Sequence, residues 1–222
     1  MGQMIEFTRP DGASSPAYLA RAAAANAPGL ILLQEWWGLN DNIRATADRY
    51  AAAGFTTLAP DLYRGRQASD ADEASHLMSG LSFADATHQD LAGALAYLRG
   101  AAGCPKVGVS GFCMGGALTV AAAVHVKGLS AASCFYGMPP ADFAAPQDVG
   151  IPFQGHYADI DDWCTPEAVK AFVALLPPGA DIHHYPAAHG FFNSSREHVY
   201  DAACADSAWQ RTLDFLRRHL QG

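Results

Sequence analysis

Short apolar runs alternate with amphipathic segments along most of the chain. The run 28–34, Pro-Gly-Leu-Ile-Leu-Leu-Gln, is apolar almost throughout and bounded by turn residues, which is typical of a strand buried on both faces of a parallel sheet. A helical period of polar and apolar positions then runs from Asn40 or Asp41 to about Ala53, with Gly54 as its stop. The same alternation predicts further strands at 55–59, 107–109, 130–136, 151–157 and 181–185, and helices at 86–99, 117–124, 166–176 and 197–220.

Two parts of the pattern are less regular. Segments 4–8 and 17–21, separated by the turn residues Pro10-Asp11-Gly12 and Ser14-Ser15-Pro16, are interpreted as a hairpin at the edge of the sheet. Residues 62–85 are expected to form a loop and a short helix over a sheet edge. Strands that alternate with helices indicate an α/β fold, in which a mainly parallel sheet carries helices on both faces. We expect a single domain over residues 1–222.

Composition and charge narrow the classes of partner. The chain has 222 residues, half of them hydrophobic, which is enough for one substantial core. Its formal net charge of −8 gives no basic footprint for nucleic acid or an anionic membrane surface, and no apolar run is long enough to span a bilayer. The N-terminus does not resemble a signal peptide, and the 5 cysteines show no metal-ligand spacing. We therefore expect reduced thiols, a cytoplasmic location, and no nucleic-acid or membrane partner.

A compact turn at 111–116, Gly-Phe-Cys-Met-Gly-Gly, joins the strand at 107–109 to the helix at 117–124. Small residues on both sides of a central nucleophile permit a strained strand-to-helix turn that lifts one side chain above the end of a sheet. Here that side chain is Cys113, and a thiolate is a good nucleophile once a base or a local field favours it. We predict that Cys113 is the catalytic nucleophile and that the remaining cysteines are small buried apolar residues.

Two later strand ends supply a base and an acid for this thiol. One predicted strand leads into His189, and the strand before it leads into a loop with Asp159, Asp161 and Asp162. His189 is predicted to accept the proton of Cys113, and one of the aspartates to orient the imidazole, although spacing alone leaves all three open. The chain order of nucleophile, acid and histidine is that of α/β-hydrolases.

Backbone amides and aromatic side chains complete the predicted site. The amide of Met114 opens the helix after the nucleophile and is expected to donate to an oxyanion. A second amide is expected from Trp36, in the loop after the strand at 28–34. Trp37 and Tyr136 are candidates for lining the substrate pocket, with packing in the core as the alternative.

Short motifs are spread along the whole chain, mostly at the predicted strand ends. They are Gln-Glu-Trp-Trp-Gly at 34–38, Ala-Pro-Asp-Leu-Tyr at 59–63, Gly-Phe-Cys-Met-Gly-Gly at 111–116, Gly-His-Tyr at 155–157 with Asp161, Tyr-Pro at 185–186 with His-Gly-Phe at 189–191, and Arg-Thr-Leu-Asp-Phe-Leu at 211–216. Together they resemble the dienelactone hydrolase family of α/β-hydrolases. The resemblance extends from the first hairpin to the last helix, and the cysteine turn combined with the Gln-Glu stretch is its most specific part.

The resemblance implies an eight-stranded α/β-hydrolase fold with a minimal lid and a Cys-Asp-His triad that needs no metal or cofactor. In the family, the acid lies five residues beyond the histidine of the Gly-His-aromatic stretch, which selects Asp161 among the three aspartates. The family also implies a role for Glu35, because its glutamate approaches the cysteine and takes the thiol proton when substrate displaces it. An acidic group next to the thiol disfavours a resting thiolate and protects it from oxidation.

One departure from the family concerns the substrate. Dienelactone hydrolases hold the substrate carboxylate with arginines, one of them four residues after the catalytic histidine, where this chain has Asn193. The other belongs to the segment after 61–63, where Arg64 and Arg66 are either solvated loop residues or contacts for an anionic substrate. Asparagine does not replace the charge of a bidentate guanidinium, so the carboxylate-binding pattern of the family is not kept.

These features predict a hydrolase that cleaves a small lactone or an activated ester, of the carboxymethylenebutenolidase type. An alkoxide or enolate leaves more readily than an amine, which disfavours peptidase activity. A carboxylesterase or a thioesterase on the same triad is the alternative, and a non-enzymatic redox or binding role is disfavoured by the intact set of expected catalytic residues. The expected partner is a small-molecule ester or lactone, and the expected state is a monomer or a weak homo-oligomer.

Overall fold

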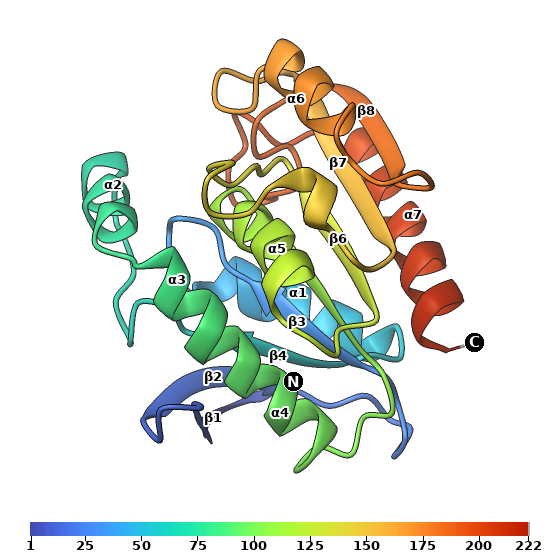
Figure 1. The fold of residues 1–222 in the computed structure, drawn as a ribbon. Coiled ribbons are helices and arrows are strands. Elements are labelled where there is room, and N and C mark those ends of the chain that lie inside the picture. The colour runs from blue at the N-terminus through green and yellow to red at the C-terminus, as the bar shows by residue number, and fades with distance from the viewer. Residues whose placement is uncertain (222) are drawn as a thin grey trace.

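One mixed sheet forms the centre of the molecule (Figure 1). The computed structural model describes residues 1–221, and its eight strands lie in the order β1-β2-β4-β3-β5-β6-β7-β8. The first two strands pair antiparallel with each other, β2 pairs antiparallel with β4, and all other pairs are parallel. This confirms the predicted eight-stranded, mostly parallel sheet. The strands are β1 (Gln3–Thr8), β2 (Ser14–Ala20), β3 (Gly29–Leu33), β4 (Thr56–Pro60), β5 (Val107–Phe112), β6 (Ala131–Phe135), β7 (Phe153–Ile160) and β8 (Asp181–Ala188).

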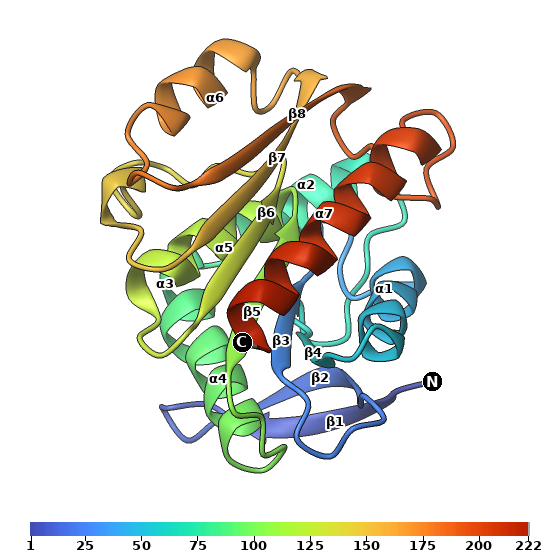
Figure 2. The same cartoon turned by 90° about the vertical axis from the view of Figure 1, so that its right-hand side faces the viewer.

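Helices cover both faces of the sheet, as Figures 1 and 2 show. One face carries α1 and α7, and the other carries α4, α5 and α6. The helices are α1 (Asp41–Ala52), α2 (Ala71–Ser79), α3 (Phe83–Asp85), α4 (Ala92–Arg99), α5 (Met114–His125), α6 (Pro166–Val173) and α7 (Ala202–Leu220), with a π-helical turn at Ala86–Leu91 and a 3-10 turn at Pro146–Asp148.

Strand β3 shows why the central strands are apolar runs. Its side chains alternate between the faces, so Leu30 and Leu32 join the core under α1 and α7 while Ile31 and Leu33 join the core under α4 and α5. All of these side chains are fully buried. A strand covered on both sides has no polar face to present to water, which accounts for the continuous apolar sequence.

The first hairpin differs from the prediction at its turn. Residues 14–16, predicted as a turn, belong to β2, and Pro16 lies opposite Glu6 of β1. The turn is made earlier, where Gly12 adopts a φ of 86° and its amide donates to the carbonyl oxygen of Arg9 at 2.9 Å. Because the chain has already reversed at Gly12, the following residues are free to pair with β1.

The structure also differs from the predicted boundaries of helices and strands in three other places. The segment 62–85 contains two helices, α2 and α3, rather than one. Strands β7 and β8 run on to Ile160 and Ala188, beyond their predicted ends. The last helix begins at Ala202 rather than near Glu197, because the side chain of Asp201 caps it by accepting the amide of Cys204. A long loop therefore separates β8 from α7.

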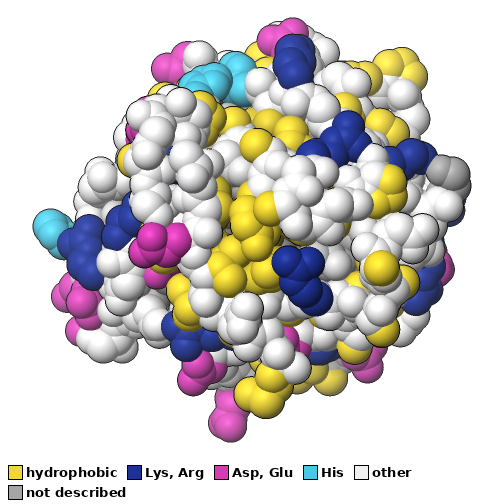
Figure 3. All heavy atoms as spheres, turned by 90° about the horizontal axis from the view of Figure 1, so that it is seen from below, with side chains coloured by type: hydrophobic (Ala, Val, Ile, Leu, Met, Phe, Trp, Pro, Cys, Tyr) yellow, Lys and Arg dark blue, Asp and Glu magenta, His cyan; other side chains and the backbone are white. Residues whose placement is uncertain are grey.

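No helix within residues 1–221 is both long and apolar enough to cross a membrane. Figure 3 shows basic and acidic side chains interspersed on one face of the molecule, around exposed apolar atoms.

Gly116 of α5 lies so close to β6 that an added methyl group has no room. A Cβ atom there would lie 2.3 Å from the carbonyl oxygen of Phe135. We expect Gly116→Ala to lower the free energy of unfolding by about 1–3 kcal/mol, the usual range for overpacking, as measured by urea denaturation. Gly150→Ala is the matched control, since its Cβ would meet nothing nearer than the carbonyl oxygen of Asp148 at 4.0 Å. Equal stability of the two variants would contradict this packing argument.

Candidate active site

The turn between β5 and α5 holds Cys113 in a strained backbone conformation. Its φ of 57° and ψ of −117° lie outside the regions that side chains usually occupy. Neighbouring glycines allow it, since a Cβ at Gly111 would lie 2.3 Å from the carbonyl oxygen of Gly115, and one at Gly115 would lie 2.5 Å from that of Gln34. The partly exposed Cys113 side chain opens into a cavity at the carboxyl end of the sheet.

His189 and Asp161 meet in the same region. Each follows the carboxyl end of a strand, β8 and β7 respectively, and Nδ1 of the imidazole lies 2.7 Å from Oδ2 of the carboxylate. The other oxygen, Oδ1, accepts the backbone N–H groups of Trp163 and Cys164, each at 2.8 Å. The Asp161 side chain is 0% exposed, so these donors replace the water that it has lost.

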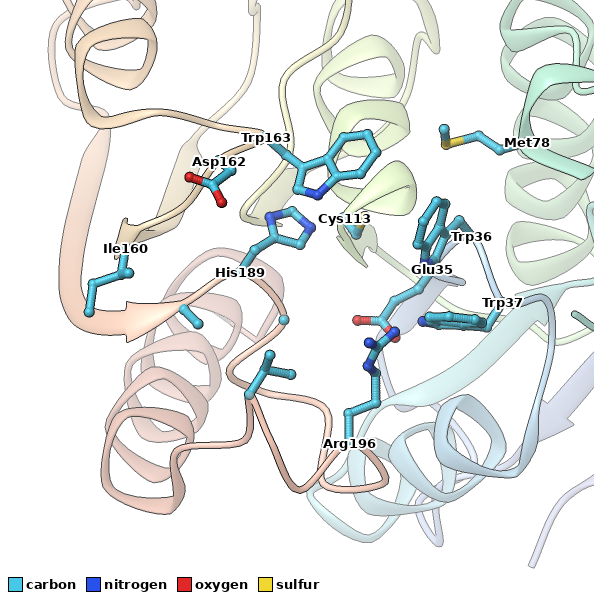
Figure 4. Close-up of a pocket in the computed structure, with 13 residues that line it drawn as sticks. Glu35, Trp36, Trp37, Met78, Cys113, Ile160, Asp162, Trp163, His189 and Arg196 are labelled. Carbon is cyan, nitrogen blue, oxygen red and sulfur yellow. The ribbon is translucent and has the colours of Figure 1, made fainter. Parts of the chain in front are cut away.

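The second ring nitrogen of His189, Nε2, is not engaged by Asp161 and is available to the thiol. It is buried and has no hydrogen-bond partner within residues 1–221, and Figure 4 shows Cys113 beside the ring. Burial lowers the pKa of His189, but the hydrogen bond with Asp161 and the interaction with the nearby thiol outweigh burial and raise the pKa to about 10. These interactions favour the protonated ring, so His189 holds firmly a proton that it takes from Cys113.

The neighbouring aspartates lie elsewhere. Asp159 belongs to β7, and its Oδ1 is 3.3 Å from Nδ1 of His184. Asp162 lines the cavity, but among the described residues the carboxylate bonded to His189 is that of Asp161. Spacing in the sequence could not separate these residues, because all of them lie within one short segment. The hydrogen bonds do separate them.

Two backbone amides near the thiol are unused. Met114 is the first residue of α5, where the amide has no helical carbonyl to bond. Trp36 lies in the loop after β3, which turns where the Gly38 amide donates to the carbonyl oxygen of Glu35 at 3.2 Å. In the part of the chain that the structure describes, neither the Met114 nor the Trp36 amide donates a hydrogen bond. Free amides of this kind are available to an oxyanion.

Glu35 is buried in the wall of the cavity, where two side chains hold its carboxyl group. Nδ2 of Asn193 donates to Oε2, and the hydroxyl of Tyr136 donates to Oε1 at 3.4 Å. Burial raises the pKa of Glu35, while the bond from Asn193 and the charges of His189 and Arg196 partly oppose the rise. No hydrogen bond joins Glu35 to the thiol within residues 1–221, so the carboxyl group is held by partners other than the cysteine.

The cavity above Cys113 has a volume of about 270 Å³ and a lining that is largely apolar and includes three tryptophans. Trp36 and Trp37 meet edge to face with their ring centroids 5.2 Å apart. The guanidinium of Arg196 lies over the Trp37 ring, 4.5 Å from its centroid. Figure 4 shows these side chains around the opening, together with Trp163 and Met78. The size and lining suit a small, largely apolar molecule.

Tyr136, a candidate for lining the pocket with core packing as the alternative, and Asn193, a candidate at the position of the family's arginine, lie behind the cavity wall rather than in its lining. Tyr136 is fully buried, and its ring packs edge-on against that of His189 with the centroids 4.9 Å apart. Asn193 is 2% exposed, and its amide is bonded to Glu35. Trp37 does line the cavity, as predicted. In this arrangement Tyr136 contacts Glu35 and His189, and Asn193 contacts Glu35.

Arg64, left open between a solvated loop residue and a contact for an anionic substrate, points to a different part of the molecule. Its guanidinium donates to both oxygens of the buried Asp90 carboxylate, at 2.8 and 2.9 Å, and to the hydroxyl of Ser15 at 3.0 Å. Arg9 also lies 3.6 Å from Asp90, so two cations surround this buried carboxylate, and a buried charge without partners is strongly destabilising. Arg64 therefore supports the junction between β2 and the π-helical turn before α4.

Trp163 and Arg196 line the cavity but were not predicted to do so. Trp163 lies directly beyond the aspartate-rich end of β7, and Arg196 lies in the loop between β8 and α7. The available signal was an aromatic and a basic residue in loops that leave the carboxyl ends of strands, where sites of this fold class gather. Met78 was missed because its helix, α2, was expected to be mostly loop.

The remaining cysteines are free thiols. Cys104, Cys134 and Cys164 are buried and Cys204 is partly buried. Burial raises the pKa of Cys134 to about 12, so this thiol stays protonated at neutral pH. Within residues 1–221, no group of three or more His, Cys, Asp or Glu side chains is placed to hold a metal ion.

Comparisons with known proteins identify the family. Protein usf of Aquifex pyrophilus is 32% identical over 232 residues, which cover 99% of this chain and 100% of that protein. A candidate carboxymethylenebutenolidase of Aquifex aeolicus is 29% identical, with 100% of both chains covered. The crystal structure of a candidate dienelactone hydrolase from Klebsiella pneumoniae matches with a TM-score of 0.86 at 28% identity, covering 98% of this chain and 99% of that one. The model of the dienelactone hydrolase family matches residues 15–220, and the chain therefore belongs to this family of hydrolases.

Proposed function

We propose that the protein hydrolyses a small lactone or an activated ester, as a carboxymethylenebutenolidase-type enzyme with Cys113 as its nucleophile. One arrangement carries the proposal, because the imidazole of His189, hydrogen-bonded to the buried carboxylate of Asp161, shares a cavity with the thiol. Membership of a hydrolase family supports the same chemistry. The roles below follow from this arrangement and from general chemistry.

Acylation begins when Sγ of Cys113 attacks the carbonyl carbon of the substrate. The thiol proton moves to Nε2 of His189, and the negative charge of Asp161 stabilises the imidazolium. The carbonyl oxygen becomes an oxyanion and accepts hydrogen bonds from the unused amides of Met114 and Trp36. The carbon–oxygen bond then breaks, and His189 returns its proton to the leaving oxygen.

Deacylation reverses these roles with water as the nucleophile. His189 removes a proton from a water molecule, which attacks the carbonyl carbon of the thioester. The carbon–sulfur bond breaks, the acid product leaves, and the proton on His189 returns to Cys113. The same amides stabilise the second oxyanion, because the carbonyl oxygen occupies the same place in both steps.

The substrate is proposed to be small and largely apolar around its reactive carbonyl. Arg64 is bonded to Asp90 and Asn193 to Glu35, so neither position offers a cation to a substrate carboxylate. Arg196 does line the cavity, but its guanidinium lies over the Trp37 ring. With no free arginine at the two family positions, simple lactones and activated esters are favoured over dienelactone itself. A carboxylesterase or a thioesterase would use the same residues, and a panel of enol-lactones, aryl esters and acyl thioesters distinguishes these activities by their kcat/KM values.

The cellular context belongs to the proposal as well. Five free thiols, several of them buried, are typical of proteins kept in a reducing compartment, which supports a cytoplasmic enzyme. We propose that it acts as one domain over residues 1–222, as a monomer or a weak homo-oligomer, on a small-molecule ester or lactone.

Cys113→Ala removes the attacking sulfur, and we expect it to lower kcat/KM for p-nitrophenyl acetate by roughly a thousand-fold or more. Release of p-nitrophenol measures the rate. Cys204→Ala removes a thiol that does not line the cavity and should leave the rate unchanged, which makes it the matched control. Undiminished turnover in Cys113→Ala would eliminate this residue as the nucleophile.

Asp161→Asn keeps the shape of the side chain but removes the charge that stabilises the imidazolium. We expect the pKa of His189 to fall by about one to three pH units, as measured by NMR titration of its ring protons. The raised pKa of His189 means that the folded chain binds this proton more tightly than the unfolded chain does. Its contribution to stability is complete below about pH 6.5 and is lost as the pH rises through about 10.

The wild-type protein should be more stable than Asp161→Asn at pH 6.5, and this difference in the free energy of unfolding should shrink as the pH rises toward 10. Asp162→Asn is the control, because Asp162 lies in the same loop but the bond to His189 comes from Asp161. A His189 titration that is the same in Asp161→Asn and the wild-type protein would refute the role given to this carboxylate.

Glu35→Gln removes a carboxyl group from the wall beside the thiol. We expect Cys113 to react roughly ten-fold faster with iodoacetamide without substrate, because a nearby carboxylate disfavours the thiolate and an amide does not. Burial raises the pKa of Glu35, so the difference should be largest above that pKa and should shrink as the pH falls through it. Glu73→Gln, which changes an exposed carboxylate on α2, is the control. Equal alkylation rates at every pH would show that Glu35 does not restrain the thiol.

A further inference from the structure

Tryptophan is concentrated at one place in this protein. The chain has 4 tryptophans, and Trp36, Trp37 and Trp163 all line the cavity above Cys113. The remaining one, Trp209, belongs to α7 and is buried against Tyr50. The first two stand side by side in sequence, but Trp163 comes from a different loop at the end of β7. Three indoles from two separate segments therefore converge on a single small cavity.

Trp163 is unusual because its side chain lines the cavity and is also exposed to solvent. Its relative exposure is 64%, and that of Ile160, which also lines the cavity, is 69%. Large apolar side chains exposed together at the mouth of a cavity are typical of a binding surface, because they gain contacts only when a ligand covers them. Only the backbone amide of Trp163 is needed to hold Asp161, so the positioning of the acid does not require the indole.

The indoles are arranged as a corner. The ring of Trp163 meets that of Trp36 at a centroid distance of 5.5 Å and an angle of 68°, and Trp36 meets Trp37 at 70°. Arg196 already lies over the ring of Trp37. The aromatic surface that stays open is thus the corner between Trp36 and Trp163, with the thioether of Met78 near it in Figure 4. Such a corner offers a flat ring one face to stack on and one edge to meet.

The position of His189 indicates which part of a substrate reaches this corner. Its ring lies 6.4 Å from that of Trp163, tilted by 41°. In ester hydrolysis the histidine protonates the leaving oxygen, so the leaving group must lie next to it. The group that contacts Trp163 is therefore the leaving alcohol, not the acyl part that stays on the cysteine.

We propose that Trp163 and Trp36 form a binding surface for a planar aromatic leaving group, so that the preferred substrates are aryl esters of small acids. This inference rests on the proposed hydrolysis at Cys113. The carbon–sulfur bond forms, the bond between the acyl carbon and the oxygen of the leaving group breaks, and the proton on His189 passes to that oxygen to release a phenol. A cavity of about 270 Å³ limits the ring system to a small one.

Two acetates that differ only in the leaving group test the proposal. Naphthyl acetate carries a flat aromatic leaving group, and trifluoroethyl acetate carries a small non-aromatic one. We expect Trp163→Ala to lower the ratio of kcat/KM for the naphthyl ester to kcat/KM for the trifluoroethyl ester by about five- to ten-fold. Trp163→Phe keeps an aromatic face and should restore most of the ratio. Leu175→Ala removes a similarly exposed apolar side chain outside the cavity and should not change it.

A binding measurement separates this inference from the proposed reaction. Calorimetry should show that naphthol binds to the Cys113→Ala protein. Adding Trp163→Ala should raise the Kd for naphthol about five-fold. If the wild-type protein hydrolyses neither ester, the proposed function fails, and the naphthol titrations still test the aromatic surface. An equal loss of activity on both esters, an unchanged ratio, or an unchanged Kd for naphthol would overturn the role of Trp163.

Discussion

The close approach of backbone segments around Cys113 is the constraint on which the candidate site depends. A Cβ at Gly116 would lie 2.3 Å from the carbonyl oxygen of Phe135, and one at Gly137 would lie 2.5 Å from that of Cys113 itself. The turn at 111–116 therefore holds α5 against the end of β6. It also keeps Cys113 in a backbone conformation that costs about 1–3 kcal/mol. The two cores on either side of the sheet keep the segments together. Because packing fixes the turn at 111–116, the backbone of Cys113 is held in one position relative to the ends of β7 and β8.

Two buried carboxyl groups near this thiol have opposite environments. Asp161 accepts hydrogen bonds from two backbone amides and is bonded to the imidazole of His189. Glu35 has the amide of Asn193 and the hydroxyl of Tyr136 as its partners, and burial raises its pKa. One carboxyl group is thus suited to support a positive charge on His189, and the other to change its protonation or position during a reaction. Differences of environment of this kind commonly give two carboxyl groups different roles in one site.

Much of this arrangement can be predicted from local sequence. Continuous apolar runs and helix caps predict the sheet and the helices that cover it. The glycines around Cys113 predict the strained turn. The turn of the first hairpin was misplaced because Ser14-Ser15-Pro16 looks like a turn, whereas Gly12 had already reversed the chain. Side-chain direction was less predictable. Arg64 points away because the buried Asp90, distant in sequence, requires a cation, and Trp163 enters the cavity only because β7 extends to Ile160 and sets the direction of its loop. Both effects depend on long-range packing, which local patterns do not contain.

The account rests on a covalent intermediate at one sulfur atom. Mass spectrometry of the wild-type protein, acid-quenched milliseconds after mixing with an aryl acetate and then digested, detects that intermediate directly. We predict an acetyl group on the peptide that contains Cys113, absent from the Cys113→Ala protein and from samples quenched after the substrate is exhausted. Steady hydrolysis of the ester with the acetyl group on another residue, or with no acetylated peptide under conditions where deacylation limits the rate, would contradict the account.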